Sequence, residues 1–472
     1  MSHRASAFTA ERLLHILQSF PAVNSYVVAF SGGADSTALL HALCAIENQL
    51  NVPLSAVHVN HGLHDDADHW QLQCEHFCLQ NNIKLACLKV DLTTRSGKGL
   101  EAEARHLRYE AISGLLKPCA GLLTAHHADD QAETLLLNLM RGSGIDGLSA
   151  MPDSRALGHG VLQRPLLGFQ SSALKDYLRE SGIEWTEDPS NQYLNHDRNF
   201  VRHEIIPLLE QRWPEVSKRL LLTRRAMTDA RLLLEGLADD FLAQNLIHPF
   251  VLRTTSQLTE NTELFKLVLR RWMKQAGLAS IPAYRLEAFF EQVGHSGADH
   301  KTAVTWGGNS LRLYRHQLWL QTGTDILPCP DVHWPEGEPE TDLGGDIGQL
   351  VLHTQDQPTD RSVPTGQTTP TGEFSVVARN STTEAVIYQG AHHKSLKNLF
   401  QLTDIPPWLR NSIPLCQLDG ELVAMGDWCF SEQFAAWMSE NSIRLSWHPR
   451  NPVLQFIHKQ QHPEVDPVGA VR

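Results

Sequence analysis

The sequence predicts an α/β protein that begins with a doubly wound parallel sheet and continues with a mostly helical domain and a small α+β C-terminal domain. Short apolar runs alternate with helical patterns through the first part of the chain, as in a parallel sheet covered on both faces. Helical, arginine-rich patterns follow, and short strand patterns return near the C-terminal end. A chain of 472 residues has room for about two to four domains.

The composition predicts a reduced, cytosolic protein without a membrane anchor. Eight cysteines are scattered and none forms a C-x-x-C pair, which argues against a disulfide framework. No signal peptide and no membrane-length apolar run is found. The formal net charge is -13, so any affinity for nucleic acid would have to come from a local basic surface.

The first strand, Val27–Phe30, runs directly into a loop of small residues and then into a helix from Thr37. A helix before Phe20 precedes this unit. Glycines let the loop bend closely around a ligand, and the free N–H groups at the helix start favour an anion. The loop is Ser31, Gly32, Gly33, Ala34, Asp35 and Ser36. We therefore expect it to bind phosphate, the alternative being an ordinary Gly-Ser turn.

Three further strands are expected at Leu54–Asn60, Lys84–Asp91 and Gly121–Ala125, with helices at about 67–81, 99–116 and 135–140 between and after them. Ligands of parallel sheets bind beyond the carboxyl ends of the strands. The segments that begin at Ser31, His61 and His126 all follow strand ends, so we expect them to line one pocket.

Two groups of candidate metal ligands occur in this region. Histidines and aspartates gather at His58, His61, His64 and His69 with Asp65, Asp66 and Asp68, but their spacing matches no standard zinc site, so we expect loop or nucleotide contacts instead. Cys74 and Cys78 lie one helical turn apart, and we expect them to pack as small apolar residues.

The segment His126–Thr134 contains two acidic residues that would share one helix face, Asp130 and Glu133. Such residues can cap the helix start. Beside a phosphate loop they can instead hold Mg²⁺ or a substrate ammonium group. We favour this second interpretation because the predicted pocket places them near the phosphate loop.

The loop S-G-G-A-D-S resembles the pyrophosphate loop of the N-type ATP pyrophosphatases; neither the P-loop nor the dinucleotide motif is present. Together with H-V-N-H-G-L, E-A-E-A-R, H-H-A-D-D-Q-A-E-T, R-G-S-G-I-D-G-L, D-P-S-N and R-N-F-V-R, it occurs in the order seen in tRNA(Ile)-lysidine synthetases. The similarity spans about residues 20–210. His64 departs from the pattern, since many relatives have arginine or a similar polar residue there.

The resemblance implies that ATP activates the wobble cytidine of tRNA(Ile) with anticodon CAU, and that L-lysine then replaces the adenylated C2 oxygen. The loop would hold the pyrophosphate, and Asp35 would position Mg²⁺. Asp130 and Glu133 would bind the lysine ammonium and take its proton. Arg105 and Arg202 would stabilise phosphate or adenylate charge. The resemblance also leaves a homodimer open.

We expect five segments. They are a catalytic domain (1–215), a helical tRNA-binding domain (216–322), a partly flexible Pro/Gly-rich connector (323–373), a tRNA-recognition domain (374–455) and a disordered tail (456–472). Basic residues between Arg198 and Arg231 would form a phosphate-tracking surface or a solvated helix face. His392, His393, Lys394, Lys397 and Arg410 are further candidates for contact with RNA.

Three other functions fit parts of the sequence. A tRNA thiolase of the same superfamily would use the same loop but commonly needs a C-x-x-C pair, which is absent. A small-molecule ligase would not need the basic helices. A non-enzymatic RNA-binding protein would leave the ATP loop and the carboxylate pair unexplained.

Overall fold

The computed structural model describes residues 7–60, 62, 66–90, 100–187, 197–295, 302–323, 326–354, 369–381, 386–389 and 392–462. The side chains of residues 100–106 fall outside this description, and Arg105 is among them. The chain divides into two compact units, Met1–Leu234 and Glu235–Arg472.

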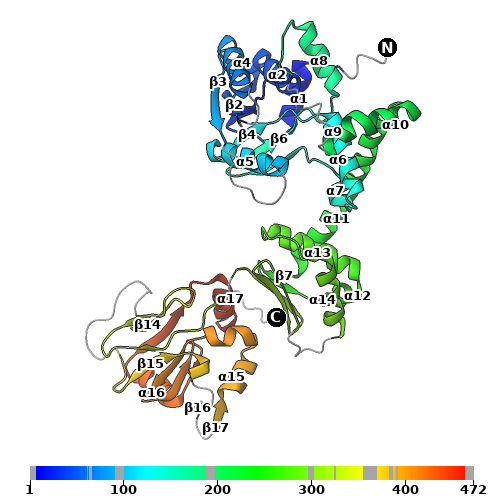
Figure 1. Ribbon diagram of the computed structural model, residues 1–472. Helices are drawn as coiled ribbons and strands as arrows, with labels where there is room; N and C mark the ends of the chain where they lie inside the picture. The colour runs from blue at the N-terminus through cyan, green and yellow to red at the C-terminus, as the bar shows by residue number, and fades with distance from the viewer. Residues whose placement is uncertain are drawn as a thin grey trace. The chain divides into compact units, whose positions relative to one another are not determined.

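The first unit is built on a six-stranded sheet with the order β3-β2-β1-β4-β6-β5 (Figure 1). Neighbouring strands are parallel except at the edge, where β5 runs antiparallel to β6. The strands are β1 (Ser25–Ala29), β2 (Leu54–Asn60), β3 (Lys84–Lys89), β4 (Ala120–Leu123), β5 (Ser154–Leu157) and β6 (Gly160–Gln163). The predicted parallel sheet is confirmed, but the sequence analysis missed the β5–β6 hairpin.

Helices cover both faces of this sheet. Leu13, Leu39 and Leu174 belong to a core on one face, and Ile112 packs with Leu122 in a separate core on the other. This division is the doubly wound arrangement that the alternating pattern predicts. The helices are α1 (Ala10–Ser19), α2 (Ala34–Ala45), α3 (Glu47–Leu50), α4 (Ala67–Gln80), α5 (Leu100–Leu115), α6 (Ala128–Met140), α7 (Ile145–Leu148) and α8 (Ser171–Glu180).

A helical segment completes the first unit. It comprises α9 (Asp197–Phe200), a π-helical turn η3 (Val201–Ile205), α10 (Ile206–Arg212) and the start of α11 (Val216–Asn245). Residues 188–196, which include the D-P-S-N motif, lie outside the described residues. The chain therefore enters the described structure again at α9, just before the R-N-F-V-R motif.

The second unit starts with helices packed on an antiparallel sheet of order β7-β8-β11-β10-β9. The helices are α12 (Ser256–Glu260), α13 (Thr262–Gln275) and α14 (Ala283–His295), and the strands are β7 (Leu246–His248), β8 (Val251–Arg253), β9 (Ala303–Trp306), β10 (Asn309–Tyr314) and β11 (Gln317–Gln321). Phe265, Trp272 and Phe289 fill the core between them. The predicted helical domain with a closing β segment is thus present.

Antiparallel sheets form the rest of this unit, in the orders β12-β15-β18-β19-β20, β13-β14-β21 and β16-β17. Their strands are β12 (Val332–His333), β13 (Glu340–Asp342), β14 (Gln349–Thr354), β15 (Phe374–Val377), β16 (Val386–Gln389), β17 (His392–Ser395), β18 (Leu415–Leu418), β19 (Glu421–Met425), β20 (Cys429–Phe430) and β21 (Ile443–His448). The helical elements are η4 (Arg379–Ser381), α15 (Leu396–Leu402), η5 (Pro407–Ser412), α16 (Glu432–Glu440) and α17 (Pro452–Gln461).

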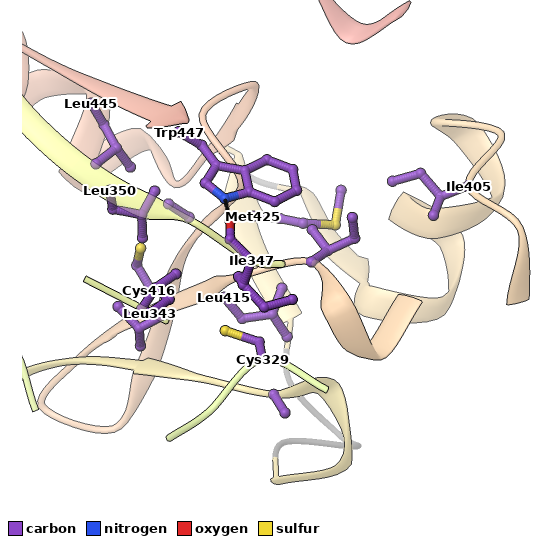
Figure 2. Packing of buried hydrophobic residues seen from close by; sticks show 14 of the residues in the cluster. Cys329, Leu343, Ile347, Leu350, Ile405, Leu415, Cys416, Met425, Leu445 and Trp447 are labelled. Atoms are coloured by element: carbon purple, nitrogen blue, oxygen red, sulfur yellow. Dashed lines mark hydrogen bonds between the residues drawn. The ribbon is translucent and has the colours of Figure 1, made fainter. Parts of the chain in front are cut away.

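Much of the predicted connector is part of these sheets. Strand β12 pairs with β15, and β14 pairs with β21 over six residue pairs. Figure 2 shows Leu343, Ile347 and Leu350 packed with Leu415, while the Trp447 indole Nε1 donates a hydrogen bond to the Ile347 carbonyl at 2.8 Å. The prediction of a connector does not describe residues 326–354, because their apolar side chains supply core area to strands far along the chain. Residues 355–368 lie outside the described part.

The predicted tail also needs correction. Helix α17 continues to Gln461, and its Leu454 and Ile457 are fully buried in the C-terminal core. Residues 463–472 lie outside the description. A search of the described helices finds none with the length and apolar character needed to cross a membrane.

Candidate active site

The phosphate loop connects β1 to α2 in the conformation that its glycines predict. Gly32 has φ +81°, and a Cβ there would lie 3.0 Å from the Cys74 sulfur. Both the backbone angle and the close approach therefore require glycine. Gly33 is the N-cap of α2 and provides no side-chain cap. The first-turn amides of this twelve-residue helix are thus suited to an anionic ligand.

Hydrogen bonds within the loop fix its shape. The Ser31 N–H donates to Ser36 Oγ at 3.3 Å, and Ser36 Oγ donates to the Gly33 carbonyl at 3.0 Å. From outside the loop, the Thr186 N–H donates to the Gly32 carbonyl at 2.9 Å. These bonds restrict the conformations of the loop, which lowers the entropy cost of ordering it around a ligand.

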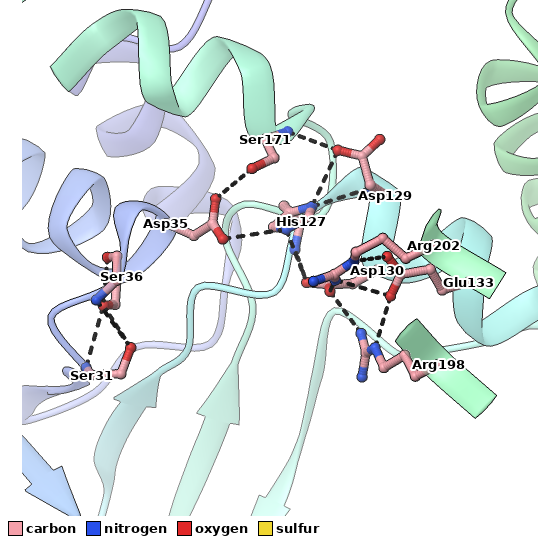
Figure 3. Close-up of polar contacts among 11 residues, drawn as sticks. Ser31, Asp35, Ser36, His127, Asp129, Asp130, Glu133, Ser171, Arg198 and Arg202 are labelled. Atoms are coloured by element: carbon pink, nitrogen blue, oxygen red, sulfur yellow. Dashed lines mark hydrogen bonds and ion pairs between the residues drawn. The ribbon is translucent and has the colours of Figure 1, made fainter. Parts of the chain in front are cut away.

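A buried histidine links the start of α2 to the start of α6 (Figure 3). His127 follows β4, and its Nε2 lies 3.4 Å from Asp35 Oδ2 and 3.5 Å from Asp130 Oδ2. Its Nδ1 lies 3.4 Å from Asp129 Oδ2. Ser171 donates its hydroxyl to Asp35 at 2.9 Å and its N–H to Asp129 at 2.8 Å. Asp35 and the acidic start of α6 therefore belong to one network.

The three carboxylates set the charge of His127. Burial lowers its pKa, but hydrogen bonds and charges from Asp129, Asp35 and Asp130 outweigh burial and raise the pKa to about 10. The imidazole is therefore a cation at neutral pH, and it offsets part of the negative charge beside the phosphate loop.

Asp130 and Glu133 lie on one face of α6 and bind two arginines (Figure 3). Arg198 donates Nε to Glu133 at 2.8 Å and a terminal nitrogen to Asp130 at 2.7 Å. Arg202 makes the same pair of contacts at 2.6 and 3.0 Å. Glu133 is 1% exposed and Asp130 is 7% exposed. The four side chains form a compact, charge-balanced group, named below the carboxylate–arginine group.

Electrostatics keep Asp130 and the two arginines ionised despite burial. Burial raises the pKa of Asp130, but His127, Arg198 and His126 outweigh it and bring the pKa to about 2. The carboxylates in turn raise the pKa of both arginines above its ordinary value. The Asp130 carboxylate also accepts a hydrogen bond from the backbone N–H of His127 at 2.9 Å. It therefore caps α6 and binds the arginines at the same time, so the two interpretations of this residue are compatible.

The structure brings together most of the predicted site residues. Asp35, Asp130, Glu133 and Arg202 lie in one connected network, and the loop Ser31–Ser36 adjoins it at Asp35 (Figure 3). The position of the Arg105 side chain is outside the described residues, and so are His61, His64 and Asp65 from the histidine-rich segment. His58 is buried, and its ring nitrogen Nδ1 lies 2.9 Å from the carbonyl oxygen of Phe30, directly after β1.

Sequence reasoning missed four members of the network, namely Arg198, His127, Asp129 and Ser171. The sequence pattern places Arg198 on a basic surface, and only its i,i+4 spacing to Arg202 indicates that the two arginines share a helix face. His127 and Asp129 lie in the H-H-A-D-D motif directly after β4, where side chains of a parallel sheet meet. Ser171 has no recognisable pattern around it, and only the fold reveals its place.

Comparisons with known proteins identify domains in three parts of the chain. Family models match a PP-loop domain at residues 6–209, a TilS substrate binding domain at 258–319 and a TilS substrate C-terminal domain at 374–447. The PP-loop match implies that the chain binds ATP.

Relatives match over nearly their whole length. The tRNA(Ile)-lysidine synthase of Alkalilimnicola ehrlichii is 36% identical over 428 residues, covering 90% of this chain and 94% of the relative. That of Methylococcus capsulatus is 35% identical over 433 residues, covering 90% and 97%. A solved U34-tRNA thiolase from Methanococcus maripaludis covers 46% of this chain and 79% of its own at 18% identity, with a TM-score of 0.38, which is too low to support a conclusion. The chain, with its pyrophosphate loop and its substrate-binding domains, therefore belongs to the tRNA(Ile)-lysidine synthase family.

Proposed function

We propose that this chain joins L-lysine to C2 of the wobble cytidine of tRNA(Ile) with anticodon CAU, using ATP and releasing AMP and pyrophosphate. The product, lysidine, pairs with A instead of G, which changes the codon read from AUG to AUA and the identity from Met to Ile. The main support is the adjacency of the phosphate loop and the carboxylate–arginine group, together with relatives that carry this activity by name.

The first step of the proposed reaction is adenylation of the tRNA. The C2 oxygen of the cytidine attacks the α phosphate of ATP, an O–P bond forms, and pyrophosphate leaves. Negative charge grows on the leaving group, where the amides of Ser31–Ser36 and the first turn of α2 can stabilise it. An anticodon-loop base can leave its stack at low cost to reach this site.

The second step is attack by lysine. The ε-amine forms a C–N bond to C2, the C2–O bond breaks, and AMP leaves with the oxygen. Free lysine is protonated at neutral pH, so its ammonium must lose a proton before attack. Glu133 and Asp130 are the proposed groups that bind the ammonium and accept that proton.

Both carboxylates are bound to arginines in the structure. Lysine binding at this point must therefore displace one guanidinium group from its carboxylate. The proposed destination is the phosphate of the adenylate, since guanidinium binds phosphate bidentately. Arg202 is proposed for this role, and Arg105 stays a prediction as a second phosphate ligand.

The residues around Asp35 fit Mg²⁺. The carboxylates of Asp35 and Asp129 and the Ser171 hydroxyl are oxygen donors of the kind that Mg²⁺ prefers. Ser171 donates its hydroxyl to Asp35 Oδ1 at 2.9 Å, so these two oxygen donors lie side by side. When bound, the ion would neutralise phosphate charge.

A cytoplasmic location and a homodimer complete the proposal.

Transfer of radiolabelled lysine to a tRNA(Ile) transcript with anticodon CAU, in the presence of ATP and Mg²⁺, tests the proposed function. A methionine tRNA transcript with the same anticodon is the matched control. We expect incorporation into the first transcript alone. If the tRNA is adenylated but no lysine is incorporated, the assignment of the nucleophile is wrong. If neither product forms, the proposed activity is wrong.

A further inference from the structure

A second cluster of potential ligands lies in the C-terminal part of the chain, within the second unit. Among the residues that the structure describes, Asp427, His458 and His462 form a group whose ligand atoms all lie within 4.8 Å of one another. His458 Nε2 is 3.0 Å from both oxygens of Asp427. His462 Nε2 is 2.9 Å from Asp427 Oδ1. Both rings thus point the same nitrogen at one carboxylate.

The elements that carry these residues hold them in place. His458 lies on α17 and His462 is the C-cap residue that directly follows this helix, and both rings direct Nε2 toward Asp427. Asp427 follows β19, is 9% exposed, and accepts the Trp447 N–H at 3.0 Å. A hydrogen bond that fixes a carboxylate in this way is a regular feature around metal ligands.

The helix is anchored independently of the cluster. Leu454 and Ile457 are buried, and Gln461 donates to the Thr403 carbonyl at 2.9 Å. The histidine side chains stay partly open to solvent, at 23% and 31% exposure. The site is therefore preformed on one side and accessible to an ion and a water molecule on the other.

We propose that Asp427, His458 and His462 bind a Zn²⁺ ion, with water as the fourth ligand. Two imidazole nitrogens and one carboxylate oxygen are a regular zinc ligand set with an open position. Ligands of tetrahedral zinc lie about 3.4 Å apart, given bonds of about 2.0–2.2 Å. The histidine-to-carboxylate separations of 2.9 and 3.0 Å need to widen by only a few tenths of an ångström, which small side-chain rotations provide. Imidazole ligands disfavour Mg²⁺ and Ca²⁺.

The bound ion would join the last described helix to the β19–β20 connection. Its role is therefore structural: it secures α17 on the C-terminal domain. This inference does not depend on the proposed reaction, because none of the three residues belongs to the PP-loop unit.

ZnCl₂ titration of the full-length, chelator-treated chain by isothermal calorimetry tests the site, with thermal unfolding followed in parallel. The test variant is His458→Gln with His462→Gln, since glutamine retains a hydrogen bond to Asp427 while removing the imidazole ligands. Asp427→Asn is a second test variant. The matched control is His15→Gln with His76→Gln, which removes two exposed histidines.

We expect wild type and control to bind one more equivalent of Zn²⁺ than either test variant, or to bind it with a Kd at least 10-fold lower. Added Zn²⁺ should raise the Tm of wild type and control more than that of the test variants. Unchanged lysine transfer and circular dichroism in the test variants would show that they fold. Equal zinc stoichiometry and affinity in all four proteins, or no zinc binding by wild type, would overturn the proposal and leave the cluster as an ion pair.

Discussion

Three carboxylates around one buried imidazole dominate the chemistry of the site at the level of single residues. The folded-state pKa of His127, about 10, exceeds its ordinary value of 6.5. Folding is therefore favoured by protonation, and this contribution to stability is full below pH 6.5 and is lost as the pH rises to about 10. Asp130 behaves in the opposite sense, because its pKa falls from 3.8 to about 2. Its contribution is full above pH 3.8 and is lost as the pH falls through about 2.

Substituting His127→Asn should destabilise the protein most near pH 6 and progressively less toward pH 10. Asparagine cannot be protonated and is favoured at N-cap positions, so the substitution removes the charge without placing an unfavourable residue at the start of α6. Urea unfolding of wild type and variant at several pH values measures the difference in unfolding free energy. A difference that does not change between pH 6.5 and 10 would contradict the cationic state of His127.

Glu133 is held by three hydrogen bonds from two arginines. Removing one partner from a buried ion pair leaves the other charge uncompensated. Since the arginine side chains are 22% and 33% exposed, we take the low end of the usual cost, about 3 kcal/mol. The residue therefore has a structural role in addition to its proposed part in lysine transfer.

Replacing Glu133→Gln should keep ATP-dependent adenylation of the tRNA and lower lysine transfer about 100-fold or more, the usual size of a general-base effect. Separate assays for adenylated tRNA and for lysidine, together with urea unfolding, distinguish the two roles. The exposed carboxylate of Glu110 offers a control, Glu110→Gln, which should leave all three measurements unchanged. Full lysine transfer by Glu133→Gln would exclude the proposed role.

A π-helical turn decides the position of the arginines at the level of secondary structure. Arg198 lies on α9 and Arg202 on η3, and both meet the same face of α6. Turns of this kind widen a helix locally and occur often at functional sites. The two arginines are four residues apart and the two carboxylates three, so two short segments suffice to build the whole group.

Strand β12 and the chain beside it illustrate how a proline-rich stretch can be part of a domain. Trp334 follows β12, is 1% exposed, and donates its Nε1 to the Glu338 carbonyl at 3.0 Å. Its ring lies 5.1 Å from that of Phe374. Because Trp334 is buried in the C-terminal core, the residues around it are part of the domain and not a linker.

Trp334→Ala should destabilise the C-terminal part by about 3–5 kcal/mol, as expected for loss of a buried aromatic side chain. Leu327→Ala removes a side chain that is 70% exposed and should change stability by less than about 0.5 kcal/mol. Urea unfolding of the full chain measures both. If Trp334→Ala has as little effect as Leu327→Ala, residues 326–354 act as a linker after all.

The whole chain has a formal net charge of -13. Binding of tRNA, which is also negatively charged, therefore requires local basic patches. Not every arginine of the predicted basic surface is available for this purpose. Arg198 and Arg202 belong to the carboxylate–arginine group, and Arg224 donates to the carbonyls of Ser149 and Met151. Arg219 and Arg225 on α11 are exposed and are the better candidates for phosphate contacts.

Substituting Arg219→Ala and Arg225→Ala together should weaken tRNA binding and reduce the slope of log affinity against log salt by about 1.5, since each phosphate contact contributes about 0.7–0.9. Filter binding of tRNA(Ile) at several salt concentrations measures the slope. Arg224→Ala is the comparison, and it should lower stability with little change in slope. An unchanged slope in the double variant would remove α11 from the proposed RNA surface.

The sequence alone determined the parts of this protein that depend on local pattern. Spacing and residue type over a few positions predict the strand, loop and helix around Gly32. They also predict that the first strands run parallel and that α6 has an acidic face. The pyrophosphate loop could be identified for the same reason, because its glycines and its helix start are contiguous in the chain.

Only the tertiary structure decided what depends on contacts between distant segments. The partners of Glu133 lie 65 and 69 residues away, and no periodicity in the sequence connects them. The same holds for Ser171 beside Asp35, for β14 paired with β21, and for α17 packed on the C-terminal core. In each case a buried charge or an apolar surface is satisfied by a residue that only folding brings near, and local patterns carry no information about such partners.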